Sequence, residues 1–251
     1  RVLTLNNYAA TPTRLARVGM DSELAHIHDY ASYLLDQAIE NTGIPRSTIS
    51  KMGCLPPLVA SYVADAAPDY GSARSQYEQL IAVQIEHVDG FLVETMSNVT
   101  EMSAARDALV AADQPVRIGI TLKDDGSNRL RSGEPLSTAI EILSDGPLET
   151  VMINCSQPET IPPALSELAK LGCSYGAYAN GFKSIAPLRP GGTVRDLEFR
   201  RELDSETYTA RVLEWLQLGA TIVGGCCEIT PAYIQHLHQA LIDRNILITS
   251  F

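Results

Sequence analysis

Short apolar runs alternate with longer amphipathic stretches along the chain. The runs are nearly continuously apolar, which is typical of strands buried on both faces of a sheet. We expect seven strands, at Val2–Asn6, Thr48–Gly53, Gly90–Glu94, Val116–Thr121, Thr150–Asn154, Ser174–Tyr178 and Ala220–Gly224. The clearest helical patterns are Glu23–Glu40, Asn98–Ala112, Thr207–Leu218 and Ala232–Arg244, the last preceded by a Thr230-Pro231 cap.

Regular alternation of strands and helices predicts parallel strands joined by right-handed crossovers. A closed barrel of this kind has eight strands, whereas we count seven and the first begins at Val2. The alternative, an open doubly wound sheet, normally shows a glycine-rich phosphate turn after its first strand, and this chain has none there. We therefore predict an α/β fold, a (β/α)8 TIM barrel, in which residues 1–251 form a single domain that lacks the first βα unit.

Composition and charge narrow the class of protein. Hydrophobic residues make up 45% of the chain and charged residues 20%, which is ordinary for a globular protein. There is no apolar run of about 18 residues and no signal-peptide pattern, so we expect a cytoplasmic protein without a membrane partner. The net charge of −11 argues against a nucleic-acid partner. Five cysteines, two of them adjacent, do not form the framework of a disulfide-rich domain.

The residues that end the predicted strands carry the chemical information. In a barrel all of these positions face one mouth, where active sites of the fold lie. They are Asn6-Asn7, Cys54, Glu94, Thr121, Asn154-Cys155, Asn180 and Cys226-Cys227. Two long connections, from Cys54 to about Ala73 and from Asn180 to about Asp204, are expected to shape a substrate pocket or lid.

Three of these cysteines suggest a metal site. Cys155 and Cys226 lie about two βα units apart, so their strands are separated by one strand. Gly224-Gly225 would let the backbone turn so that Cys226 and Cys227 reach one centre. Three thiolates form a soft site suited to zinc, and three protein ligands leave the fourth position open, as in catalytic sites. A zinc ion held by three thiolates is better suited to binding a substrate thiol as thiolate than to generating hydroxide from bound water.

The spacing alone leaves other interpretations open. Cys155, Cys226 and Cys227 could instead reflect a Cys226–Cys227 vicinal disulfide or coincidence, and Cys54 and Cys173 are expected to be packing residues. A zinc hydrolase would use histidine and aspartate ligands, but all five histidines fall in helical stretches and none ends a strand. Glu94 ends a buried strand, so we expect it to face a polar site.

Several segments resemble the homocysteine S-methyltransferase family, which includes betaine- and S-methylmethionine-dependent enzymes. The specific matches are Ile153–Pro158, similar to the family's Asn-Cys segment, and Gly224–Pro231, similar to its Gly-Gly-Cys-Cys segment. Leu5–Thr11, Phe91–Thr95 and Tyr178–Gly181 resemble further strand ends, so that the resemblance covers essentially the whole chain.

The resemblance implies a function and a set of site residues. A barrel with Zn²⁺ on Cys155, Cys226 and Cys227 would move a methyl group from a sulfonium or quaternary ammonium donor to the thiolate of L-homocysteine, giving methionine. Glu94 would hold the homocysteine amino group. Asn154 and Asn180 would line or support the pocket, and Asn6, in the segment that resembles a family strand end, is a further substrate-binding candidate.

The chain also departs from the family pattern. Nothing matches the family's Asp-Gly-Gly segment on strand one, in agreement with the seven strands counted here. Gly53–Pro57 differs from the commoner Gly-Pro-Tyr-Gly loop, so the methyl-donor side is expected to differ. The alternative functions are a non-catalytic zinc- or thiol-binding barrel and, less favoured, a zinc hydrolase. The expected partners are the two small-molecule substrates, with the chain a monomer or homodimer.

Overall fold

The computed structural model describes residues 1–189, 191–192 and 194–249. Its strands form one parallel sheet in the order β1 to β7. The strands are β1 (Val2–Thr4), β2 (Ser50–Leu55), β3 (Gly90–Met96), β4 (Val116–Ile120), β5 (Leu148–Asn154), β6 (Ser174–Tyr178) and β7 (Ile222–Val223). All seven predicted strands are confirmed.

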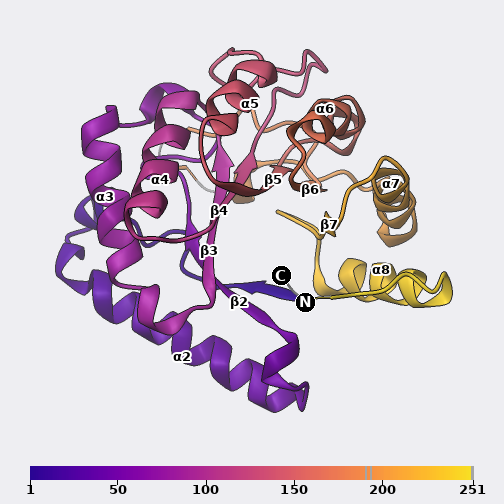
Figure 1. Ribbon diagram of the computed structural model, residues 1–251, viewed down its shortest axis with the longest axis horizontal. Coiled ribbons are helices and arrows are strands. Elements are labelled where there is room, and N and C mark those ends of the chain that lie inside the picture. Colours follow the sequence, from indigo (N-terminus) through magenta and orange to yellow (C-terminus); the bar gives the residue numbers. More distant parts are fainter. Residues whose placement is uncertain (190, 193, 250–251) are drawn as a thin grey trace.

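The sheet curls so that its strands lie at the centre and its helices lie outside them (Figure 1). The α-helices of the described residues are α1 (Pro12–Ala16), α2 (Leu24–Thr42), α3 (Tyr70–Ala82), α4 (Val99–Ala111), α5 (Leu136–Ser144), α6 (Ile161–Leu168), α7 (Ser205–Gln217) and α8 (Pro231–Asp243). No helix among them is long and apolar enough to cross a membrane. The curl brings the carboxyl ends of the strands to one face.

The barrel is not closed. In the described part of the chain no pairing joins β7 to β1, so the sheet has two edges. Between these edges lies a groove of about 580 Å³, lined by apolar side chains that include Val2, Met152, Ile222 and Leu241. This fold is an incomplete (β/α)8 barrel, as the strand count predicts.

Two apolar layers hold the barrel together. The larger lies between the sheet and the outer helices and contains fully buried Phe91, Leu109 and Trp215. A smaller cluster lies inside the barrel, where Met52, Leu92, Met152 and Tyr178 pack together. Alternating side chains of each strand thus contribute to the two layers, as expected for strands buried on both faces.

The first and last strands are shorter than predicted. Asn7 is buried and its amide donates to His28 Nδ1 and to Gln84 Oε1, both at 2.8 Å, so the chain leaves the sheet and β1 ends at Thr4. β7 contains only two residues. It approaches β6 so closely that a Cβ on Gly176 would lie 2.0 Å from the carbonyl oxygen of Ile222.

Caps account for where the predicted helices begin. The Asn98 side chain accepts a hydrogen bond from the backbone N–H of Glu101, and the Asp204 side chain accepts one from Thr207. Thr230 occupies the N-cap position of α8 as predicted, with Pro231 as the first helical residue, but its side chain makes no capping hydrogen bond. The capping rule thus accounts for the starts of α4 and α8, whereas α7 begins at Ser205, two residues before the predicted Thr207, because Asp204 caps it.

Candidate active site

The three cysteines predicted as metal ligands meet at the carboxyl ends of β5 and β7. Their Sγ atoms all lie within 4.8 Å of one another, and Cys155 Sγ lies 3.9 Å from Cys227 Sγ. In this structure Cys155 and Cys226 form a disulfide, with Cα atoms 5.5 Å apart, and Cys227 is free. The suggested Cys226–Cys227 vicinal disulfide is therefore wrong, because the curl of the sheet brings Cys155 against Cys226.

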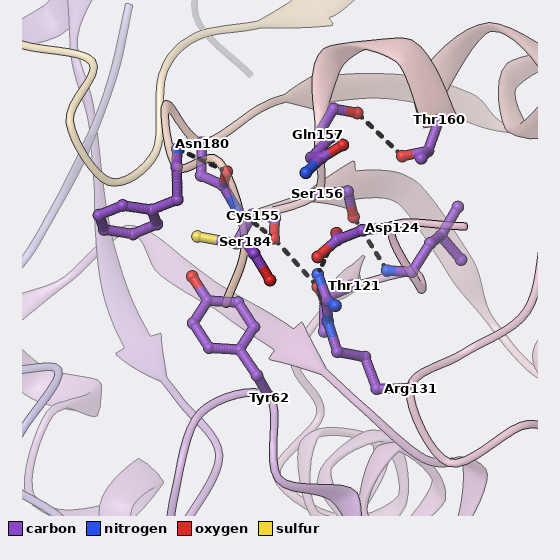
Figure 2. Close-up of polar contacts among 12 residues, drawn as sticks. Tyr62, Thr121, Asp124, Arg131, Cys155, Ser156, Gln157, Thr160, Asn180 and Ser184 are labelled. Carbon is purple, nitrogen blue, oxygen red and sulfur yellow. Dashed lines mark hydrogen bonds and ion pairs between the residues drawn. The ribbon is translucent and has the colours of Figure 1, made fainter. Parts of the chain in front are cut away.

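The backbone of Cys155 is held from three sides. It has a left-handed conformation, with φ of 46°, which is uncommon outside glycine. Its N–H donates to the carbonyl of Tyr178 at 3.0 Å, while its own carbonyl accepts from Thr121 Oγ1 at 3.1 Å and Asn180 Nδ2 at 2.8 Å (Figure 2). These hydrogen bonds fix the direction in which the Cys155 side chain leaves the end of β5.

The Cys226-Cys227 turn is tied to the end of β6. The N–H of Cys226 donates to the carbonyl of Ala179, and the carbonyl of Cys227 accepts from the N–H of Gly181, both at 2.9 Å. Gly225 precedes the pair in a crowded position, where a Cβ would lie 2.3 Å from Ile229 Cγ2. The close approach of Ile229 therefore leaves no room for a side chain at Gly225, whereas nothing crowds Gly224 in this way.

These sulfurs suit a tetrahedral metal ion once reduced. Zn–S bonds of about 2.3 Å place two sulfurs of a tetrahedral site roughly 3.8 Å apart. The 3.9 Å between Cys155 and Cys227 matches that separation, and Cys226 lies within the same cluster. Because a disulfide offers no thiolates, the bond between Cys155 and Cys226 has to be reduced before the three residues can bind a metal together.

The third thiol, Cys227, lies beside an aromatic side chain. Burial raises the pKa of the Cys227 thiol, and Tyr62 Oη lies 3.8 Å from its sulfur. The guanidinium of Arg131 stacks 5.2 Å from the centre of the Tyr62 ring and pairs with Asp124 at 3.0 Å (Figure 2). A divalent cation would offset the effect of burial, since a coordinated thiol is deprotonated.

Glu94 shares a cavity with the three cysteines. This cavity, hereafter the cysteine cavity, has a volume of about 980 Å³. The Glu94 carboxylate accepts from Cys54 Sγ at 3.2 Å and from Tyr178 Oη at 3.1 Å, and burial raises its pKa. The register of β3 against β4 shifts between Val93 and Met96, in the segment that contains Glu94. Glu94 thus faces a polar site, as the sequence indicates.

The structure places the three asparagines elsewhere than on the wall of this cavity. Asn154 is fully buried. Its Oδ1 accepts a hydrogen bond from the Thr95 N–H at 3.0 Å, and its Nδ2 donates one to the Thr95 hydroxyl at 2.9 Å. Asn180 supports the Cys155 carbonyl, as described above. Asn6 is exposed and does not line the cavity, whereas its neighbour Asn7 is buried. Asn154 and Asn180 therefore support residues of the site.

The sequence assigned no site role to several residues that the structure brings to the site. Cys54 is buried, as expected of a packing residue, but its thiol also contacts Glu94. Tyr178 ends β6, so the strand-end rule that selected Glu94 could have found it. Tyr62 and Arg17 lie in irregular or short segments that give no periodic signal. None of the five histidines lines the cysteine cavity.

Fold and site together define a class: parallel α/β barrels with a potential three-thiolate metal centre and a buried carboxylate at the mouth. The sequence model of the homocysteine S-methyltransferase family matches residues 1–241. The chain belongs to the homocysteine S-methyltransferase family.

Individual relatives agree with this assignment. The chain is 25% identical over 156 residues to homocysteine S-methyltransferase 2 of Arabidopsis thaliana, covering 61% of this chain and 45% of that protein. It is 26% identical over 172 residues to betaine-homocysteine S-methyltransferase of Drosophila melanogaster, covering 63% and 49%. The chain thus spans about half the length of these two relatives.

A solved structure shows the same fold. The metallated form of the homocysteine methyltransferase MmuM from Escherichia coli superposes with a TM-score of 0.76 at 21% identity, covering 95% of this chain and 79% of that one. This likeness supports the incomplete barrel described above.

Proposed function

We propose that this protein is a zinc-dependent homocysteine S-methyltransferase that uses a sulfonium or quaternary ammonium methyl donor and forms methionine. The observation that carries the proposal is the meeting of three cysteine sulfurs, within 4.8 Å of one another, in a cavity that also contains Glu94. Family membership supports homocysteine as the acceptor.

Cys155, Cys226 and Cys227 would hold the zinc ion as thiolates. When bound, zinc lowers the pKa of the substrate thiol so that it stays a nucleophilic thiolate at neutral pH. The backbone hydrogen bonds around Cys155 and Cys226 keep two of the ligands in place before the ion binds. Such preorganisation lowers the cost of assembling the site.

Glu94 would receive the ammonium group of homocysteine. Cys54 and Tyr178 each donate to a different oxygen of its carboxylate, so the group has a fixed orientation. Burial raises its pKa, and an ammonium group alongside would favour the ionised form. The homocysteine sulfur then forms a bond to the methyl carbon while the donor's C–S or C–N bond breaks, and the donor leaves with that electron pair.

The test compares cysteine variants of the full-length protein, reduced and supplied with zinc. Cys226→Ser is expected to lose tight zinc binding and to lower methionine formation by at least about a hundredfold, because loss of a group that merely supports a ligand already costs about 10–100-fold. The matched control is Cys173→Ser, which removes a free thiol at the start of β6. Normal zinc content and turnover in Cys226→Ser contradict the proposal.

A second candidate is a barrel that binds zinc or thiols without methyl transfer. The disulfide between Cys155 and Cys226 favours its thiol-binding form, because this state offers no three-thiolate metal site but can exchange with a thiol. Zinc and homocysteine binding without methionine formation from any onium donor would select this candidate. The hydrolase alternative gains no support, since no histidine lines the cavity. Cytoplasmic location, one domain, absence of nucleic-acid partners and a monomeric or homodimeric state stay predictions.

A further inference from the structure

The cysteine cavity has charges of opposite sign in its lining. Glu94 and the three cysteines lie where β3, β5 and β7 end. Arg14 and Arg17, at the short helix α1, and Arg189, in the long loop after β6, also line it. Glu94 is the one acidic residue of the lining among the described residues, although the whole chain has a net charge of −11. The lining of the cysteine cavity therefore has a local excess of positive charge, opposite in sign to the net charge of the chain.

These three arginines form no ion pair within the part of the chain that the structure describes. Arg14 donates to the carbonyls of Tyr8 and Pro57, at 3.2 and 2.7 Å, and its buried Nε–H has no acceptor there. Arg17 and Arg189 are exposed and donate only to backbone carbonyls. Other arginines, such as Arg46 and Arg117, pair with carboxylates. The guanidinium groups of Arg17 and Arg189 are thus accessible to an anion, and Arg14 adds a positive charge to the same cavity lining.

Two aromatic rings that line the cysteine cavity already have cationic neighbours. Arg14 stacks 5.4 Å from the centre of the Tyr8 ring, and Arg131 stacks 5.2 Å from that of Tyr62. An additional ammonium group beside these arginines would meet like charges, and Glu94 is already engaged by homocysteine in the proposed function. The part of the cavity lined by arginines is therefore suited to a carboxylate group and unsuited to an ammonium group.

We propose that Arg14, Arg17 and Arg189 form a carboxylate subsite for the methyl donor, and that the donor is an onium carboxylate without an ammonium group. The inference rests on the proposed function. The onium methyl points toward the thiolates and the carboxylate toward the arginines, so the charges of the cavity orient the donor. An amino-acid donor would place its ammonium group, adjacent to its carboxylate, among the same arginines.

The test uses the full-length, zinc-loaded protein with glycine betaine, dimethylsulfonioacetate and S-methylmethionine as donors. Arg17→Glu is expected to raise the KM of the accepted carboxylate donor about tenfold or more, because it replaces a charge-assisted contact with repulsion. The KM of homocysteine and the zinc content should stay within about twofold of wild type, the scatter of a surface change. Arg129→Glu is the matched control, since Arg129 is exposed and also donates to a backbone carbonyl, that of Gly133.

Two outcomes overturn the inference while leaving the proposed function intact. One is a higher kcat/KM for S-methylmethionine than for either carboxylate donor, and the other is an unchanged donor KM in Arg17→Glu. If no donor yields methionine, the proposed function fails, and calorimetry decides the subsite separately. Glycine betaine binding that Arg17→Glu weakens then supports the subsite, and absence of binding to the wild type refutes it.

Discussion

Asn154 shows how a residue outside the cavity wall can shape the site. Its buried amide satisfies both the backbone N–H and the hydroxyl of Thr95, which has a left-handed φ of 62° next to Glu94. Thr95 therefore depends on a partner from β5, two strands away along the sheet. The unusual backbone conformation is maintained because the surrounding hydrogen bonds compensate for its cost.

Replacing Asn154 by alanine should affect both stability and substrate binding. The buried Thr95 N–H would lose its acceptor, which costs about 1–3 kcal/mol of the free energy of unfolding. The KM of homocysteine should rise, because Glu94 adjoins the released segment. Urea unfolding and steady-state kinetics measure the two effects. Thr95→Ser, which keeps the hydroxyl, is the control and should change both less; equal losses in the two variants would argue against the role of Asn154.

At the residue scale the sequence predicts the groups that end strands. Cys155, Cys226, Cys227 and Glu94 were found in this way, because parallel strands bring their carboxyl ends together. The rule fails for Asn6, since β1 ends two residues earlier and the following turn buries Asn7 instead. Loop residues of the cavity, such as Arg189, have no periodic pattern that could have placed them.

At the scale of elements, an N-cap residue stabilises its helix most where its side chain makes the capping hydrogen bond. Replacing Asp204 by alanine should lower the free energy of unfolding by about 1 kcal/mol, because its carboxylate accepts from the Thr207 N–H at 2.8 Å. Thr230→Ala is the matched comparison, since Thr230 occupies an N-cap without such a bond, and it should cost only a few tenths of a kcal/mol. Urea unfolding tests the difference, and a Thr230→Ala loss equal to that of Asp204→Ala would refute it.

The sequence pattern did not predict helices α6 and α3, and the residues at the start of each helix explain why. α6 contains Pro162 and Pro163, which usually mark a break but are tolerated in a first turn where the N–H groups have no helical partner. α3 begins with Tyr70-Gly71, inside a segment that reads as a loop. Strand existence was more predictable than helix extent, because strands buried on both faces give nearly continuous apolar runs.

At the scale of the whole molecule, the curl of the sheet creates the site. Glu94, Cys155 and Cys226 come from the ends of β3, β5 and β7, and no short sequence motif contains all three. Strand alternation predicts that these ends share one face. It does not predict which cysteines pair, because the Cys155–Cys226 contact depends on how the turns after β5 and β7 approach each other.

The most direct test of the account is zinc K-edge X-ray absorption on the reduced, full-length protein, with and without homocysteine. We expect one zinc ion per chain, coordinated by three sulfurs and one lighter atom, and by four sulfurs once homocysteine is added. Such a change would show that Cys155, Cys226 and Cys227 leave an open position that the substrate thiol fills. Protein that takes up no zinc after reduction, or a sulfur count that homocysteine leaves unchanged, would contradict the account.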